Sequence, residues 1–204
     1  MPTRSARSPD VLFRVFGWLP DTQPEPLRVL RDRQGGGRHD DPDRYTALYL
    51  AREPVGAVAE AIQAFRGQEL TAEALVRPDG ARRSLATVDD SEIPALVDLD
   101  DPRVLVARRL RPSAVASGIR RLTQRIAGDA FDSGAFGLSW WSTLEASWTN
   151  VTLFDERLAS RPRVVEAIAL TLDDPVVVEA AERLGVRLAG PPGRGRRTRL
   201  TVVR

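Results

Sequence analysis

Three polar residues of types that bind small molecules recur at even spacing in the first third of the chain. Arg38 follows a glycine-rich turn, Tyr49 lies in a short apolar run, and Glu60 lies in a segment of helical periodicity, each eleven positions after the last. Arginine binds phosphate through a planar fork of N–H donors. Loop, strand and helix could therefore bring the three side chains into one pocket. Because such units are common, three solvated surface residues are the alternative.

The turn before Arg38 is Gly35–Gly37. Glycine tolerates positive φ and lets a ligand approach the backbone closely, so the turn suits a binding site, although a flexible turn explains it equally well. It is not a Walker loop, since no Gly-Lys-Ser/Thr follows it.

The segment that carries Glu60 predicts a helix beginning at Glu53-Pro54, because proline is favoured in the first helical turn. One apolar stripe follows helical spacing: Val55, Val58, Ala59, Ile62 and Phe65. Glu60 lies nearly opposite this stripe, among Gly56, Ala57 and Ala64. Either Glu60 is a solvated helix residue, or the small neighbours leave room for a ligand over its carboxylate.

The apolar run Val11–Phe16 predicts a strand that contains Arg14. An arginine within an apolar strand is either an outward-facing edge residue or a residue aimed into a polar cavity. Taken alone, the pattern favours the edge residue.

The remaining elements predict an α+β protein with antiparallel or mixed sheets, because strands and helices do not alternate regularly. Strands are expected over 46–51, 70–76, 84–88, 95–99, 137–142 and 150–154, and helices over 113–132 and 175–184, the last ending at Gly185. The segment 164–172 is apolar and ambiguous. The best stripe of the helix at 113–132 is Ile119, Leu122, Ile126 and Ala130. The adjacent Trp140 and Trp141 are expected to face opposite sides of their strand.

Composition excludes several classes of protein. The chain has 204 residues, no cysteine and one histidine, His39, so it offers no thiol chemistry and no multi-histidine metal site, and a Ser-His-Asp triad is disfavoured. No apolar run reaches the roughly 20 residues of a membrane span, and the N-terminus shows no secretory signal. We therefore expect a cytoplasmic protein. All 30 positive residues are arginine, but the net charge is only +2, so no global field favours nucleic acid.

We expect a flexible tail over residues 1–10, a folded domain over 11–190 and a basic, loop-like tail over 191–204. The last tail raises a non-enzymatic alternative, a module that binds nucleic acid or a partner through Arg194, Arg196, Arg197 and Arg199.

Taken in order, several short motifs resemble the RES domain, a family named for its Arg, Glu and Ser residues. They span roughly residues 11–155 and are LFRVF with Arg14, GGGRH with Arg38, ALYLA with Tyr49, AVAEAI with Glu60, TQRIAGDAF, GLSWWS with Ser142, and NVTLF. Two positions depart from the family pattern: His39 stands where members often have tryptophan, and Trp141 precedes the family serine.

The resemblance implies a fold similar to that of ADP-ribosyltransferases and a toxin of a bacterial toxin–antitoxin pair that consumes NAD+. It implies cleavage of the nicotinamide–ribose bond by phosphorolysis or hydrolysis, with inorganic phosphate as a possible co-substrate, or alternatively transfer of ADP-ribose to a protein. The implied partner is an antitoxin that masks the cleft. Contact with nucleic acid would occur only through that antitoxin, and no membrane, metal or prosthetic group is implied.

The resemblance also implies roles for the matched residues. Glu60 would stabilise positive charge on the ribose during cleavage, because the transition state resembles that of glycoside hydrolysis. Arg14 and Arg38 would clamp the pyrophosphate or an attacking phosphate. Tyr49 would pack on the nicotinamide ring or bond a ribose hydroxyl, and Ser142 would orient Glu60 or the ribose. Arg38 and Ser142 thus count as both catalytic and NAD-binding residues.

Overall fold

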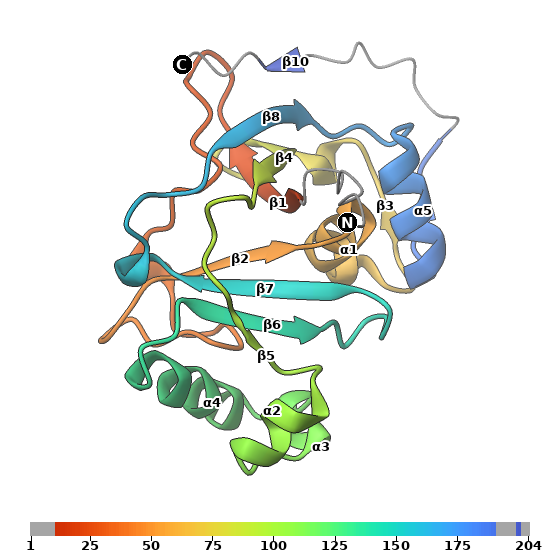
Figure 1. Cartoon of the computed structure of the whole chain (residues 1–204). Helices are drawn as coiled ribbons and strands as arrows, with labels where there is room; N and C mark the ends of the chain where they lie inside the picture. Colours follow the sequence, from red (N-terminus) through yellow and green to blue (C-terminus); the bar gives the residue numbers. More distant parts are fainter. Residues whose placement is uncertain (1–10, 191–198, 201–204) are drawn as a thin grey trace, which may run out of the picture.

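The computed structural model describes residues 11–190 and 199–200, and an eight-stranded sheet runs through it (Figure 1). The strands, in spatial order, are β10 (Arg199–Leu200), β8 (Val164–Ala169), β4 (Arg82–Asp89), β1 (Val11–Trp18), β2 (Ala47–Ala51), β7 (Thr149–Phe154), β6 (Gly137–Trp141) and β5 (Val97–Asp98). Every pair is antiparallel except β5–β6. A second, two-stranded parallel sheet joins β3 (Glu69–Leu70) to β9 (Arg187–Leu188).

Among the described residues, five α-helices flank the large sheet: α1 (Pro54–Ile62), α2 (Pro102–Ala107), α3 (Pro112–Val115), α4 (Arg120–Asp132) and α5 (Pro175–Leu184). Four of them begin at proline, whose fixed φ suits the first helical position. Helix α5 ends at Gly185 in the left-handed conformation, as expected. The α+β class with a mixed, mostly antiparallel sheet is therefore confirmed. In the described part of the chain no helix is long and apolar enough to span a membrane.

Three local predictions were wrong. The strand expected over 70–76 shrinks to Glu69–Leu70, because the Thr71 side chain accepts a hydrogen bond from the backbone of Ala74 and a 3-10 turn, Glu73–Leu75, follows. The helix expected over 113–132 is divided into α3 and α4, and Ile119 is exposed rather than part of the stripe. The C-terminal tail was expected to be loop-like, yet Arg199–Leu200 pair with β8; the rest of that tail and residues 1–10 lie outside the described residues.

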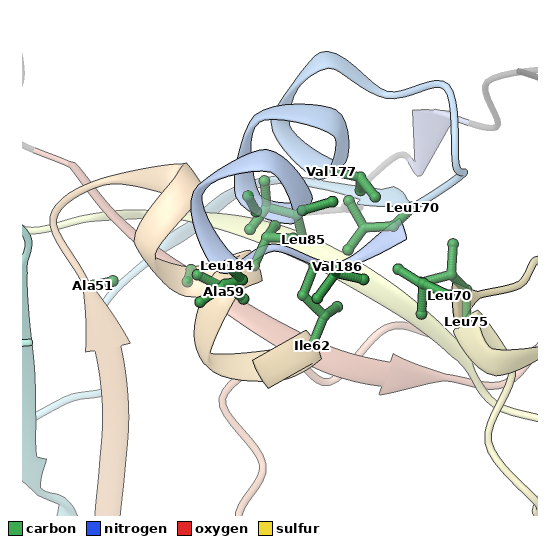
Figure 2. Close-up of a cluster of buried hydrophobic side chains, with 14 of the residues drawn as sticks. Ala51, Ala59, Ile62, Leu70, Leu75, Leu85, Leu170, Val177, Leu184 and Val186 are labelled. Carbon is green, nitrogen blue, oxygen red and sulfur yellow. The ribbon is translucent and has the colours of Figure 1, made fainter. Parts of the chain in front are cut away.

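The largest core lies between α1, α5 and the strands beside them (Figure 2). The side chains that meet there come from elements distant in sequence, such as Ile62 of α1, Leu85 of β4 and Val177 of α5. Ile62 and Val177 have no exposed surface. Burial of each such side chain contributes about 1.5–3 kcal/mol, so this cluster anchors α1, the helix that carries Glu60.

Alternation along β2 places the site on one face of the sheet. Tyr49 and Ala51 are two residues apart and share a face. Ala51 packs in the core beside α1, whereas Tyr49 packs against a second cluster that lies under α4. Leu48 and Leu50 point to the opposite face, which a third cluster covers. Helices α1 and α4 therefore lie over the same face of the sheet.

The sheet opens between β1 and β2. These neighbouring strands share a single registered pair, Phe13 with Ala51. In place of a further backbone bond, the Nη1 atom of Arg14 donates to the carbonyl of Tyr49 at 3.1 Å. The separation of the two strands leaves backbone and side chains facing an open space in the middle of the sheet.

Candidate active site

A cavity of about 360 Å³ occupies this opening and the space between α1 and the start of α4. Its lining includes four of the residues that the sequence singled out: Arg14, Arg38, Tyr49 and Glu60. The fifth, Ser142, is buried directly behind the lining. Arg14 and Ser142 are 128 positions apart in the sequence, and only the sheet brings them to one place.

Arg14 is the most deeply placed cation of the cavity. Its strand is the fourth of eight, so the interpretation of Arg14 as an outward-facing edge residue was wrong. Burial lowers the pKa of Arg14 to about 10, which leaves the guanidinium charged at neutral pH. Its Nε atom is buried and has no hydrogen-bond partner among the described residues. Because an unpaired buried donor is costly, an anion in the cavity would stabilise this side chain.

Arg38 is held from outside the cavity. Its Nη1 atom donates to the carbonyls of Val115 and Ser117, at 3.1 and 2.8 Å, where α3 ends. The guanidinium lies 5.1 Å from the ring centre of Trp140, within the range of a cation–π contact. Burial and then the nearby charge of Arg120 lower the pKa of Arg38, and the charge of Glu60 offsets part of this lowering.

The glycine turn before Arg38 is tied to the sheet by Asp40. One carboxylate oxygen accepts the backbone N–H groups of Gly35 and Gly37, at 2.8 and 2.7 Å, and the other accepts the Tyr49 hydroxyl at 2.7 Å. A Cβ atom at Gly37 would lie 2.5 Å from this carboxylate, so a side chain there would displace Asp40 from its hydrogen bonds. The turn is thus a rigid support for Arg38.

This network also changes what Tyr49 can do. Its hydroxyl donates to Asp40 and accepts the backbone N–H of His39 at 2.8 Å. Burial, followed by the charge of Asp40, raises the pKa of Tyr49. With the hydroxyl engaged, packing by the ring remains the prediction for Tyr49, rather than a bond to a ribose hydroxyl.

His39 and Trp141, the two departures from the family pattern, do not line the cavity. His39 is fully buried beneath it, where its Nδ1 bonds the Thr152 hydroxyl at 2.9 Å and its ring meets Trp140 edge-on. Burial lowers the pKa of His39 to about 3, so the ring is neutral. Trp140 lines the cavity, whereas Trp141 is half-buried against the cluster under α4.

Glu60 faces the cavity from α1, and its carboxylate is held in place on both oxygens. Oε1 accepts the Ser142 hydroxyl at 3.0 Å and the Asn150 amide at 3.1 Å, while Oε2 accepts the amide of Gln63 at 2.9 Å. Ser142 in turn accepts the backbone N–H of Leu144. The interpretation of Glu60 as a solvated helix residue is wrong, because two buried side chains orient its carboxylate. They are Ser142, which directly follows β6, and Asn150 of β7.

Sequence reasoning missed three residues of this site: Asn150, Asp40 and Arg120. Asn150 holds Glu60, Asp40 holds the glycine turn, and Arg120 lines the cavity from the first turn of α4. A signal existed for Asp40, since an Asp shortly after a glycine turn commonly binds its backbone. For Arg120 and Asn150 no local pattern exists.

The charged side chains of the cavity face it without neutralising one another. Three arginines and one glutamate line it, a net charge of +2, and none of the four forms an ion pair within the described part of the chain. No group of three or more metal-ligating side chains occurs in residues 11–190. The arrangement is a cationic cavity with one oriented carboxylate, suited to a ligand that carries phosphate and develops positive charge elsewhere.

The comparisons with known proteins identify the family and a similar fold. The family model of the RES domain matches residues 11–173, and the chain therefore belongs to the RES domain family. The fold is similar to a chain in the crystal structure of the M. tuberculosis MbcT–MbcA toxin–antitoxin complex, with a TM-score of 0.63 and 19% sequence identity. That match covers 86% of this chain and 89% of the other. No curated protein sequence matches the chain.

Proposed function

We propose that this protein is a toxin of a toxin–antitoxin pair that degrades NAD+ by cleaving its nicotinamide–ribose bond. The observation that carries the proposal is the Glu60 carboxylate, oriented by Ser142 and Asn150 in a cavity whose other charged side chains are arginines. Membership of the RES domain family and the fold shared with a toxin–antitoxin complex support it.

The reaction explains why one carboxylate stands among cations. When the bond between the ribose and nicotinamide breaks, its electron pair leaves with nicotinamide, which becomes neutral, and positive charge develops on the ribose. A fixed carboxylate beside that ribose stabilises the charge without reorganisation. Ser142 and Asn150 both bond the same oxygen, which leaves Oε2 to meet the ribose or its 2′-hydroxyl once Gln63, an exposed residue, moves aside.

The arginines suit the pyrophosphate of NAD+. Arg14 contributes a buried, incompletely bonded guanidinium, and Arg38 contributes a guanidinium anchored on one side only. Charge-assisted bonds to phosphate are shorter and stronger than neutral ones. Tyr49 and Trp140 offer aromatic surfaces beside them for a planar ring.

The direct test is product analysis. Purified protein is incubated with NAD+, with and without inorganic phosphate, and the products are identified by mass spectrometry. We expect free nicotinamide together with ADP-ribose, if water accepts the ribose, or ADP-ribose 1″-phosphate, if phosphate does. Transfer of ADP-ribose to a protein would instead label that protein. NAD+ that stays intact under all these conditions would refute the proposed activity.

Uncontrolled loss of NAD+ would arrest a cell, so we propose that an antitoxin masks the cavity. Expression of this chain alone in a bacterial host is expected to lower cellular NAD+ and stop growth. Co-expression with the protein encoded beside it is expected to restore both. High-level expression of the active protein with normal growth and unchanged NAD+ would contradict this part of the proposal.

A further inference from the structure

Arg120 is a third cation of the cavity that the proposed function does not use. It is the first residue of α4, where the unpaired backbone N–H groups of a helix give partial positive charge. Its side chain is exposed and forms no hydrogen bond or ion pair with any described residue. The next residue, Arg121, is also exposed but lines a separate hollow instead.

Arg38 offers its free edge to the same space. Both of its hydrogen bonds to Val115 and Ser117 come from Nη1, so Nε and Nη2 donate to no described group. The charge of Arg120 is among the causes that lower the pKa of Arg38, second only to burial, which places the two cations near each other. The charge of Arg120 also helps to lower the pKa of the buried His39, after burial and the charge of Arg38.

Two like charges held near each other raise the energy of the empty cavity, because each disfavours the charged form of the other. Glu60 does not relieve this repulsion by an ion pair, since its carboxylate is bonded to Ser142, Asn150 and Gln63. The net charge of +2 in the cavity is what a doubly charged anion, such as a pyrophosphate or a free phosphate, would neutralise.

We propose that Arg120 is a phosphate-binding residue that acts together with the free edge of Arg38. The inference rests on the proposed function only for the source of the phosphate, which is either the pyrophosphate of NAD+ or a free phosphate ion. Arg14 then binds from β1, and Glu60 stays available for the ribose.

The neighbouring arginines provide a matched pair of variants. Arg120→Ala and Arg121→Ala each remove one exposed, unpaired arginine from the first turn of α4, and both lower the total charge equally. Thermal melting controls for folding. Binding is measured by isothermal titration calorimetry with two probes, ADP-ribose and inorganic phosphate, so the readout does not depend on NAD+ cleavage.

We expect Arg120→Ala to lower the affinity for at least one probe about tenfold. Arg121→Ala should lower the affinity for neither probe by more than about twofold. If ADP-ribose binding falls, Arg120 holds the pyrophosphate. If phosphate binding measured in the presence of saturating ADP-ribose falls, Arg120 holds a free phosphate.

Equal affinities of the parent and Arg120→Ala for both probes would overturn the inference, and so would equal losses in the two variants, because nonspecific charge would then explain them. Such a result leaves the proposed function standing if the parent still cleaves NAD+. A parent that binds neither probe would also overturn the inference, and NAD+ cleavage would then decide the proposed function by itself. If the parent does not cleave NAD+ but Arg120→Ala binds phosphate more weakly than the parent, only the proposed function is refuted.

Discussion

The two edges of β1 differ sharply. Against β4 the strand is paired along its whole length, from Val11 with Asp89 to Trp18 with Arg82. Against β2 it shares only the pair Phe13–Ala51, and the Arg14 side chain takes the place of a backbone donor. One edge satisfies its polar groups within the sheet, whereas the other leaves them facing a cavity.

This difference separates stability from function within one strand. The closed edge leads to the core shared by α1 and α5, which contains buried apolar side chains and fixes the helix that carries Glu60. The open edge holds polar groups that are incompletely bonded, such as the buried Nε of Arg14. Unpaired buried polar groups in a native structure often mark a ligand site. Substitutions on the open side should therefore affect activity, and substitutions on the closed side should affect stability.

The largest effect is expected from Glu60→Gln on the open side. The amide keeps the shape and can still accept from Ser142, but the negative charge is lost. Turnover of NAD+ should fall about a hundredfold, or about 3 kcal/mol in transition-state stabilisation, with NAD+ affinity and melting temperature nearly unchanged. Glu179→Gln on α5, another helical glutamate, is the control and should leave NAD+ turnover, NAD+ affinity and melting temperature unchanged. Parental turnover in a folded Glu60→Gln variant would refute the mechanism.

His39 lies beneath the cavity and not on either edge of β1, and it tests a buried polar group that is structural. Because its pKa is lowered to about 3 from an ordinary 6.5, the unfolded chain binds a proton between these values and the folded chain does not. The free energy of unfolding should therefore decrease as pH falls from 7 to 5, by about 2 kcal/mol from this group. Urea unfolding at both pH values measures it.

His39→Asn removes this titration, and its free energy of unfolding should lose about 2 kcal/mol less than that of the parent over the same pH range. The variant is expected to be less stable at pH 7, since the bond to Thr152 and the contact with Trp140 change. An equal pH dependence in the two proteins would contradict the assignment to His39.

Asp40→Asn tests the rigidity of the turn that carries Arg38. An amide cannot accept hydrogen bonds on both sides, so at least one of the donors at Gly35, Gly37 and Tyr49 loses its partner. If Asp40 acts by positioning Arg38, the KM for NAD+ should rise about tenfold while kcat changes much less. Asp41→Asn, next in the chain and partly exposed beside Arg44, is the control. A fall in kcat at constant KM would argue against positioning.

The smallest effect is expected on the closed side from Ile62→Val. The side chain has no exposed surface, and loss of one methylene should lower the free energy of unfolding by about 1 kcal/mol. NAD+ cleavage by the folded protein should stay at the parental rate. Denaturant unfolding and a cleavage assay well below the melting temperature measure the two. A change in cleavage as large as that of Asp40→Asn would erase the distinction between the two edges.

The sequence by itself determined the local elements. Apolar runs placed β1, β2 and β7, and the apolar stripe with proline at one end placed α1. These patterns are readable because they depend on neighbours within a few residues. The family motifs also named Arg14, Arg38, Tyr49, Glu60 and Ser142 before any geometry existed, although their roles remain predictions.

Tertiary structure alone decided how these residues meet. The chain between Val115 and Arg120 breaks one expected helix into α3 and α4, and the carbonyls exposed at the break bond Arg38, 77 and 79 positions away. That break also brings Arg120 to the cavity. Neither contact leaves a periodic signal, because hydrogen bonds between distant segments depend on how strands pair. The opening between β1 and β2 is of the same kind, since no residue pattern distinguishes a strand that pairs on both edges from one that pairs on one.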